Sequence, residues 1–338
     1  MSTKVRIQYY DALKALAILG VIFLHSFLLW NPSVNILNHS ISNLEHIGRF
    51  GVPVFLLISG ALLLGRDEDI LVFYKKRVVR ICYPLLFFIL IAYIFQIYKN
   101  PLTAFWYCWM ILGAYLAIPF INKMVQNSTI RELEYFLLIF VCSSLFYQTM
   151  HTVNLTFSLD LNFFITPISY LILGYYLSRK EFNQSSNHIV IISFALFVIS
   201  TALKIQFGNF FNIYPVAGMY SSLDFGILEL IQAGSLFLLV RFIYDDVTGI
   251  LERIKSILKQ KTVNGIIMSI SRASYGMYLV HMLFLKQYFR PMAKAMALSN
   301  SQMLLYTVGI FFFLFLSSWI ITVVLGKIPY LNKFSGYA

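Results

Sequence analysis

Long apolar runs separated by short polar segments dominate the chain. A membrane-spanning helix needs about 20 predominantly apolar residues, and windows of this size predict about ten spanning helices. The expected ranges are 9–31, 48–65, 82–98, 103–122, 133–150, 163–178, 187–206, 221–241, 264–286 and 302–325. The longest hydrophilic segment between them covers about 245–263, so we expect no soluble domain. The pattern predicts an all-α, polytopic membrane protein with one transmembrane domain over residues 1–338.

Composition agrees with this fold class. Of the 338 residues, 59% are hydrophobic and 12% are charged, whereas a soluble domain carries about 25% charged residues. The lipid bilayer is therefore the expected surrounding. A net charge of +12 raises the alternative of a nucleic-acid partner, and the distribution of the charges decides against it.

Lysine and arginine concentrate in every second inter-helix segment. With the N-terminus in the cytoplasm, 18 of the 26 lysines and arginines fall on the inner side. The other eight are the outer residues Arg49, Lys99, Lys204, Lys286, Arg290 and Lys294, and the residues Lys14 and Arg272 within spans. Inner loops of membrane proteins are enriched in lysine and arginine. The bias therefore predicts a multi-pass protein of the cytoplasmic membrane with both termini inside, and it explains most of the charge without nucleic acid.

Three ionisable residues share one face of the first predicted helix. Lys14 and His25 are separated by about three whole helical turns, so they point the same way about 16 Å apart, and Asp11 falls within about 40° of His25. Such groups are costly in a membrane helix unless they line a cavity or meet partners. An imidazole with a reference pKa of about 6.5 can serve as a general base at neutral pH. We interpret this stripe as a reaction site; the alternative for His25 is a hydrogen bond to a neighbouring helix.

A basic segment, Phe73-Tyr-Lys-Lys-Arg-Val-Val-Arg80, precedes the third predicted helix on its inner side. Arg77 and Arg80 are three residues apart and share a helix face. Paired guanidinium groups suit phosphate and pyrophosphate because each offers a fork of donors. With Lys76, they form a candidate site for a phosphorylated cofactor; the alternative is a topology determinant that contacts anionic lipid.

A polar stripe also follows the ninth predicted helix. Tyr275, Tyr278 and His281 are spaced by three residues and are candidate substrate or cavity residues. Arg272, in the same helix, is a buried cation that needs a partner. The candidate partners are Asp224 and Glu229 in the eighth predicted helix. The alternative is a packed aromatic seam with a structural ion pair.

Weaker signals have simpler interpretations. Ser59 could be a nucleophile, but small residues in membrane helices more often permit close packing. Solvation in the first outer loop is favoured over metal or acceptor binding for His39, Glu45 and His46, because no spacing indicates a metal site. An interfacial aromatic belt is expected for Trp106, Tyr107 and Trp109.

These constellations, in this order, resemble the acyltransferase-3 family of integral membrane O-acyltransferases. The matching segments are Tyr10-Asp-Ala-Leu-Lys-Ala-Leu-Ala-Ile18, Gly51-Val-Pro-Val-Phe-Leu-Leu-Ile-Ser-Gly60, the basic segment 73–80, Trp106 through Tyr115-Leu-Ala-Ile-Pro119, Leu173-Gly-Tyr-Tyr176 and Ser274-Tyr-Gly-Met-Tyr-Leu-Val-His281. The most specific element is the Arg/Lys-x10-His pattern met by Lys14 and His25. The likeness is to stand-alone members without an extracytoplasmic esterase-like domain, such as the enterobacterial common antigen O-acetyltransferase.

The resemblance implies an enzyme that moves an acyl group, with acetyl expected, from cytoplasmic acyl-CoA to a hydroxyl of a cell-surface glycan or its lipid-linked precursor. It implies no metal. His25 would act as a general base or carry the acyl group transiently, with Asp11 orienting or charge-balancing Lys14. The chain departs from the family where His-Leu-Trp is common in the fourth helix, because Ala104-Phe-Trp106 stands there instead.

Two alternatives belong to other functional classes. In a membrane transporter, the charged stripe would be a substrate or proton path. In a polysaccharide-export system, the chain would be a flippase or structural component. Hydrolysis of acyl-CoA that depends on His25 would separate the enzyme from both.

Overall fold

The computed structural model describes the chain except residues 1–6, 31–42, 154–158, 208–225, 296–298 and 338. Within these described residues the regular elements are helical, and eleven α-helices are ten residues or longer. The α-helices are α1 (Gln8–Phe27), α3 (Gly51–Leu63), α4 (Ile70–Ile94), α5 (Pro101–Ala104), α6 (Trp106–Asn127), α7 (Ile130–Thr152), α8 (Pro167–Arg179), α9 (Ser186–Phe207), α10 (Ile227–Ile243), α11 (Ile250–Lys259), α12 (Lys261–Phe284), α13 (Arg290–Ala295) and α14 (Asn300–Lys327). The shorter turns include η1 (Leu28–Trp30), η3 (Asn43–Gly48), η4 (Asn162–Phe164), the π-helical η6 (Leu285–Phe289) and η7 (Asn332–Phe334).

Each predicted segment overlaps a helix, but some bounds differ. α4 begins at Ile70 rather than at residue 82, because the Asp69 side chain caps it by accepting a hydrogen bond from the Val72 N–H at 3.0 Å. The basic segment 73–80 is therefore part of a membrane helix and not a loop before it. Residues 245–263, predicted as a hydrophilic loop, contain α11.

Six helical segments among the described residues are long and apolar enough to cross a membrane, so the chain is a polytopic membrane protein. They are Gln8–Phe27, Asn43–Leu63, Ile70–Ile94, Trp106–Asn127, Ser186–Phe207 and Asn300–Lys327. The first two have 72% of their apolar window buried, against 22–33% in the other four. The first two therefore form the centre of the bundle, and the other four lie at its periphery.

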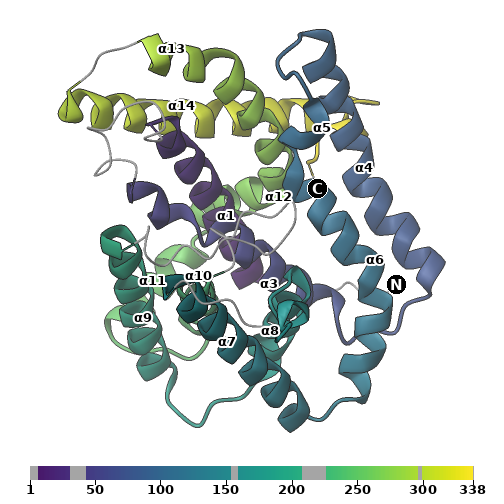
Figure 1. Cartoon of the computed structure of the whole chain (residues 1–338), viewed down its shortest axis with the longest axis vertical. Coiled ribbons are helices and arrows are strands. Elements are labelled where there is room, and N and C mark those ends of the chain that lie inside the picture. Colours follow the sequence, from purple (N-terminus) through teal and green to yellow (C-terminus); the bar gives the residue numbers. More distant parts are fainter. Residues whose placement is uncertain (1–6, 31–42, 154–158, 208–225, 296–298, 338) are drawn as a thin grey trace.

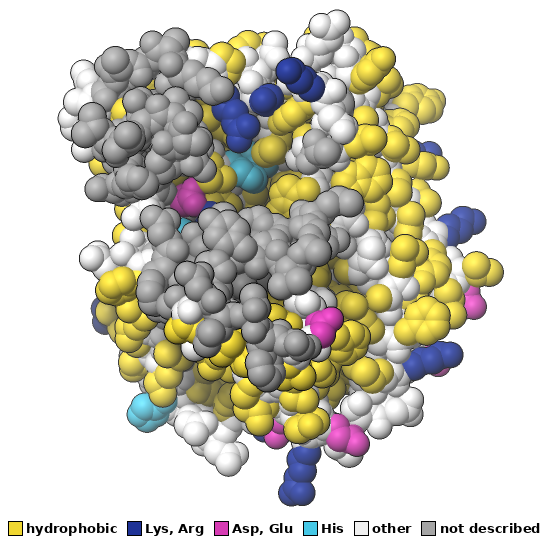
Figure 2. Space-filling model, viewed as in Figure 1, with side chains coloured by type: hydrophobic (Ala, Val, Ile, Leu, Met, Phe, Trp, Pro, Cys, Tyr) yellow, Lys and Arg dark blue, Asp and Glu magenta, His cyan; other side chains and the backbone are white. Residues whose placement is uncertain are grey.

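α1 crosses the middle of the bundle (Figure 1) and packs against α3, α10, α12 and α14. The outer helices present large apolar side chains to the surroundings, among them Phe120 at 75% and Leu305 at 76% exposure. Hydrophobic side chains accordingly cover much of the visible surface in Figure 2. Such a surface suits lipid and not water.

Two glycines bring α3 and α8 into backbone contact. A Cβ on Gly60 would lie 1.8 Å from the carbonyl oxygen of Leu171, and a Cβ on Gly174 would lie 2.0 Å from that of Leu57. Only glycine permits such an approach. The crossing fixes α3 at the centre of the bundle, next to α1.

The C-terminal segment returns to the bundle and packs on α12 and α4. Gly336 adopts a positive φ of 70°, and a Cβ on Gly276 would lie 2.2 Å from the carbonyl oxygen of Ser335. Phe334 contacts the rings of Tyr83 and Phe87, with centroids 5.9 and 5.7 Å away. This segment therefore closes one side of the space between α4 and α12.

Candidate active site

A cavity of about 610 Å³ lies between α1, α3, α4, α6 and α12. It brings together residues of the three constellations singled out in the sequence, although Asp11 and Ser271 are 260 residues apart along the chain. Asp11 and Lys14 come from α1, and Arg77 and Arg80 come from α4. The residues that α12 contributes are Ser271, Arg272, Ser274, Tyr275 and Tyr278.

Positive charge dominates the cavity wall. Its cationic residues are Lys14, Arg66, Arg77, Arg80 and Arg272, and its one carboxylate among the described lining residues is Asp11. The carboxylate of Asp11 is buried and accepts a hydrogen bond from Ser271 Oγ at 2.6 Å. A low-dielectric wall with such an excess of cations is suited to an anionic ligand.

Two polar atoms of the wall are buried without a hydrogen-bond partner. They are the Nε of Arg77 and the hydroxyl of Tyr278. Buried polar groups in folded proteins are nearly always paired, so an unpaired one calls for a specific explanation. Because both residues line the cavity, a ligand with acceptor atoms would provide the missing partner.

Lys76 is not part of this wall. Its ammonium group is paired with Glu68 at 2.6 Å, and its side chain is 58% exposed. One residue along a helix is a rotation of about 100°, which turns Lys76 away from the face that carries Arg77. The prediction that Lys76 joins the two arginines in one site was therefore wrong.

His25 lies beyond the cavity and not in its wall. Val21, one helical turn earlier on α1, lines the cavity, whereas the lining does not include His25. The imidazole of His25 meets that of His281, with Nδ1 of His25 2.9 Å from Nε2 of His281 and ring centroids 5.1 Å apart. The two histidines, one from α1 and one from α12, are therefore in direct contact.

The hydrogen bonds of the histidine pair define its tautomers. His281 Nδ1 lies 2.9 Å from the carbonyl oxygen of Met277, and a carbonyl can only accept. When both rings are neutral, each carries one N–H. His281 therefore donates through Nδ1 and accepts through Nε2, so His25 donates through Nδ1. This arrangement leaves Nε2 of His25 with a free lone pair.

Tyr275 and Tyr278 occupy the cavity wall one turn apart on α12, as the polar stripe predicts. The Tyr275 hydroxyl donates to the Ile81 carbonyl oxygen at 2.8 Å, which ties α12 to α4. The Tyr278 ring lies 5.8 Å from the ring of His281. Tyr278 thus lies between the cavity and the histidine pair.

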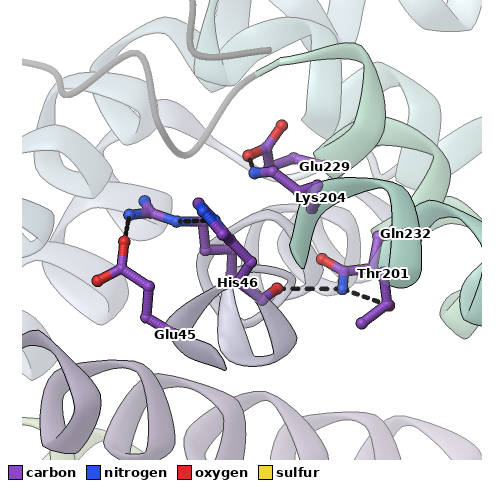
Figure 3. Close-up of polar contacts among 7 residues, drawn as sticks. Glu45, His46, Thr201, Lys204, Glu229 and Gln232 are labelled. Carbon is purple, nitrogen blue, oxygen red and sulfur yellow. Dashed lines mark hydrogen bonds and ion pairs between the residues drawn. The ribbon is translucent and has the colours of Figure 1, made fainter. Parts of the chain in front are cut away.

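Glu229 does not lie with Arg272. It forms an ion pair with Lys204 of α9, and both side chains are buried (Figure 3). In the predicted topology Glu229 lies in the first turn of α10, at the outer side of the membrane, whereas Arg272 lines the cavity. The two residues therefore lie at different depths in the membrane. Asp224, the other predicted partner, lies outside the described residues.

The residues of the first outer loop form a buried network that is linked to the helix of Glu229 through Gln232, whose Nε2 donates to the His46 carbonyl oxygen at 3.3 Å. His46 is 3% exposed, and its Nδ1 accepts from Arg49 Nε at 3.0 Å. Arg49 also pairs with Glu45 (Figure 3). The prediction of a solvated loop was wrong for Glu45 and His46, because η3 folds against α1 and α9; His39 lies outside the described residues.

Sequence reasoning missed several wall residues. Arg66, just after α3, entered only the charge count, although its place at the inner side beside the basic segment was a usable signal. Tyr107 was assigned to an aromatic belt, yet it lines the cavity, as does Tyr115. Ser59 also lines the cavity, with its hydroxyl donated to the Phe55 carbonyl oxygen at 2.8 Å.

A family model described as an acyltransferase domain matches residues 7–323. The match covers most of the chain and includes every described element from α1 to most of α14. Comparison with curated proteins and with solved structures gives no significant match.

Proposed function

The chain belongs to the acyltransferase 3 family, and we propose that it is an O-acyltransferase that uses cytoplasmic acyl-CoA, with acetyl-CoA expected. The acceptor we propose is a hydroxyl of a cell-surface glycan or its lipid-linked precursor. That the chain is a membrane acyltransferase follows from its family; the donor and the acceptor are the proposal.

The excess of cations in the cavity is the observation that carries the donor assignment. Coenzyme A presents a pyrophosphate and a further phosphate, and guanidinium forks match phosphate oxygens. Arg77 and Arg80 share a face of α4, and the Nε of Arg77 is buried without a partner. A phosphate oxygen at that place would satisfy this donor and balance the surplus positive charge.

The predicted topology supports entry of the donor from the cytoplasm. We propose ten membrane crossings with both termini inside, because the lysine and arginine bias requires it. Arg66, Arg77 and Arg80 then lie at the inner side, and His25 lies nearer the outer side. The donor would reach the cavity from the cytoplasm, and the acceptor would approach His25 from the opposite face.

The histidine pair supports a general-base mechanism. The acceptor hydroxyl oxygen attacks the carbonyl carbon of the thioester, a C–O bond forms, and the C–S bond then breaks. Nε2 of His25, with its free lone pair, takes the hydroxyl proton. The coenzyme A thiolate leaves and receives that proton. His281 positions the base through its hydrogen bond to Nδ1.

The proposal is tested with purified protein in lipid nanodiscs. Radiolabelled acetyl-CoA is supplied with a set of lipid-linked and free glycans, and both labelled product and free thiol are measured. We expect thiol release above background, and acylated product when the acceptor is present. Uptake of an unmodified glycan or of acetyl-CoA into sealed vesicles, without thiol release, would instead indicate a transporter.

The topology is tested by cysteine accessibility. Single cysteines at Lys99 and Lys333, both exposed, are introduced into a variant in which Cys82, Cys108 and Cys142 are replaced by serine. A membrane-impermeant maleimide applied to intact cells should label position 99 and not position 333. Labelling of both positions from outside would contradict the proposed arrangement.

A further inference from the structure

Tyr278 presents a buried hydroxyl that the protein itself leaves without an acceptor. The residue is 5% exposed and lines the cavity, yet its hydroxyl has no hydrogen-bond partner among the described residues. The backbone group that acts on the phenol oxygen is the N–H of Tyr107, which is itself a donor. The hydroxyl proton therefore has no acceptor among the residues that the structure describes.

The surroundings of this hydroxyl are specific. Tyr107 is the second residue of α6, so its N–H is one of the donors that an α-helix leaves unpaired at its start. The rings of Tyr107 and Tyr278 are in edge contact, with centroids 5.4 Å apart. The phenol oxygen thus faces the positive end of a helix dipole, at the cavity wall.

Tyr278 is also the wall residue next to the proposed base. Its ring lies 5.8 Å from that of His281, which is hydrogen-bonded to His25 at 2.9 Å. The reacting carbonyl must lie within reach of both the donor cavity and His25. The part of the wall that meets both conditions carries the Tyr278 hydroxyl.

Tyr275 shows that the unpaired hydroxyl is not a general feature of this wall. One turn before Tyr278 on the same helix, its hydroxyl donates to the carbonyl oxygen of Ile81 at 2.8 Å. A phenylalanine at position 278 would fill the same space without an unsatisfied polar group. Stability alone therefore gives no reason for a tyrosine at 278.

We propose that the Tyr278 hydroxyl is a catalytic residue that donates a hydrogen bond to the carbonyl oxygen of the acyl thioester. This inference rests on the proposed acyl-transfer function and adds a role to it. When the acceptor oxygen bonds to the carbonyl carbon, the electron pair of the C=O double bond moves to the carbonyl oxygen. That oxyanion is stabilised by Tyr278 until it re-forms the double bond and the C–S bond breaks. The phenol keeps its proton throughout, because His25 carries the proton from hydroxyl to thiolate.

The first test compares Tyr278→Phe with Tyr275→Phe in the nanodisc assay. Loss of a donor aimed at an oxyanion lowers turnover by about 10²–10³-fold. We expect this fall in kcat for Tyr278→Phe, with an unchanged Kd for acetyl-CoA and a melting temperature equal to or above that of the wild type. Tyr275→Phe loses a formed hydrogen bond and should melt at a lower temperature. A kcat for Tyr278→Phe within threefold of the wild type would overturn the inference.

A second test varies the acidity of the phenol without changing its shape. Fluorotyrosines with one to three fluorine atoms are introduced at position 278. If the hydroxyl donates to a developing oxyanion, log kcat should change steadily with the acidity of the phenol. A flat series with normal donor binding would show that Tyr278 only fills space.

Failure of the two proposals can be told apart. If the wild-type protein releases no thiol from acetyl-CoA and forms no acylated product, the proposed function fails. If the wild type is active and neither test moves kcat, only the role of Tyr278 fails.

Discussion

Two groups of charged residues differ in how their charges are balanced. In the outer network (Figure 3), Arg49 pairs with Glu45 and Lys204 pairs with Glu229. The inner cavity instead combines five cationic residues with one carboxylate, Asp11, among the residues described. The side chains of the outer network are buried or nearly so, whereas the five cations of the cavity wall are half-buried or exposed.

This difference in charge balance indicates which of the two groups binds a ligand. A buried ion pair compensates its own desolvation and needs nothing from outside. A surplus of cations around one cavity is best compensated when an anion enters it. We therefore interpret the outer network as a structural clamp between η3, α9 and α10, and the cavity as the binding site. Four predictions test this comparison.

The largest expected effect is on the rate of acyl transfer when His25, which lies beyond the cavity wall, is replaced. His25→Ala removes the proposed general base and should lower acyl transfer by about 10²–10⁴-fold, while the protein is expressed and inserted normally. Turnover of labelled acetyl-CoA measures it, with His188→Ala as the control, because His188 is an exposed histidine at the start of α9. Activity of His25→Ala near that of the control would contradict the mechanism.

The next largest effect concerns the outer network. Glu229→Leu leaves Lys204 buried without its carboxylate, which should destabilise the fold by about 3–5 kcal/mol. The double replacement Lys204→Met with Glu229→Leu removes both charges and should recover most of the lost stability. Thermal unfolding in detergent measures both variants. An unchanged melting temperature for Glu229→Leu would show that the outer network does not hold η3, α9 and α10 together.

Removing a cation from the cavity wall should weaken donor binding without lowering the stability of the fold. Arg77→Met and Arg80→Met should each raise the KM for acetyl-CoA about ten- to a hundredfold, since a hydrogen bond to a charged group contributes about 1.5–3 kcal/mol. Their melting temperatures without ligand should stay equal or rise, because a surplus charge is removed. Lys76→Met, on the exposed face with Glu68, is the matched control. Equal effects of all three variants on KM would return this segment to a role in topology alone.

The smallest predicted effect tests the positioning role of His281. His281→Leu removes the acceptor for His25 Nδ1 and should lower kcat about tenfold, a cost near 1.4 kcal/mol and within the range for one lost buried hydrogen bond. His281→Gln keeps a donor toward the Met277 carbonyl and an acceptor toward His25, so it should restore most of the rate. Equal rates for Leu and Gln would mean that the contact between the rings does not position the base.

The sequence predicted the helices well because their signal is local. Apolar runs and the lysine and arginine bias are readable within one window, and α14 lies within a few residues of its predicted range. The start of α4 was missed because it depends on a single cap, Asp69. Hydropathy does not detect a helix that continues through basic residues such as those at 75–80.

The candidate site could be predicted only in part, because the helices that enclose it come together only in the folded protein. Spacing correctly grouped Arg77 with Arg80, and Tyr275 with Tyr278. It could not show that Glu229 meets Lys204, since that pairing depends on how α9 packs on α10. Nor could it identify the tautomer of His25, which is determined by hydrogen bonds that extend through His281 to Met277.

The composition of the cavity wall has a consequence for biosynthesis. The wall combines Asp11 and Lys14 with Tyr278 and Gly336, which leave the ribosome long after them. A chain arrested after α11 would carry both arginines of α4 but no opposing wall. The nascent protein therefore acquires its donor site only when α12 has inserted and the segment around Gly336 has folded back. Until that moment a partly translated enzyme has no enclosed site in which to hold an acyl donor.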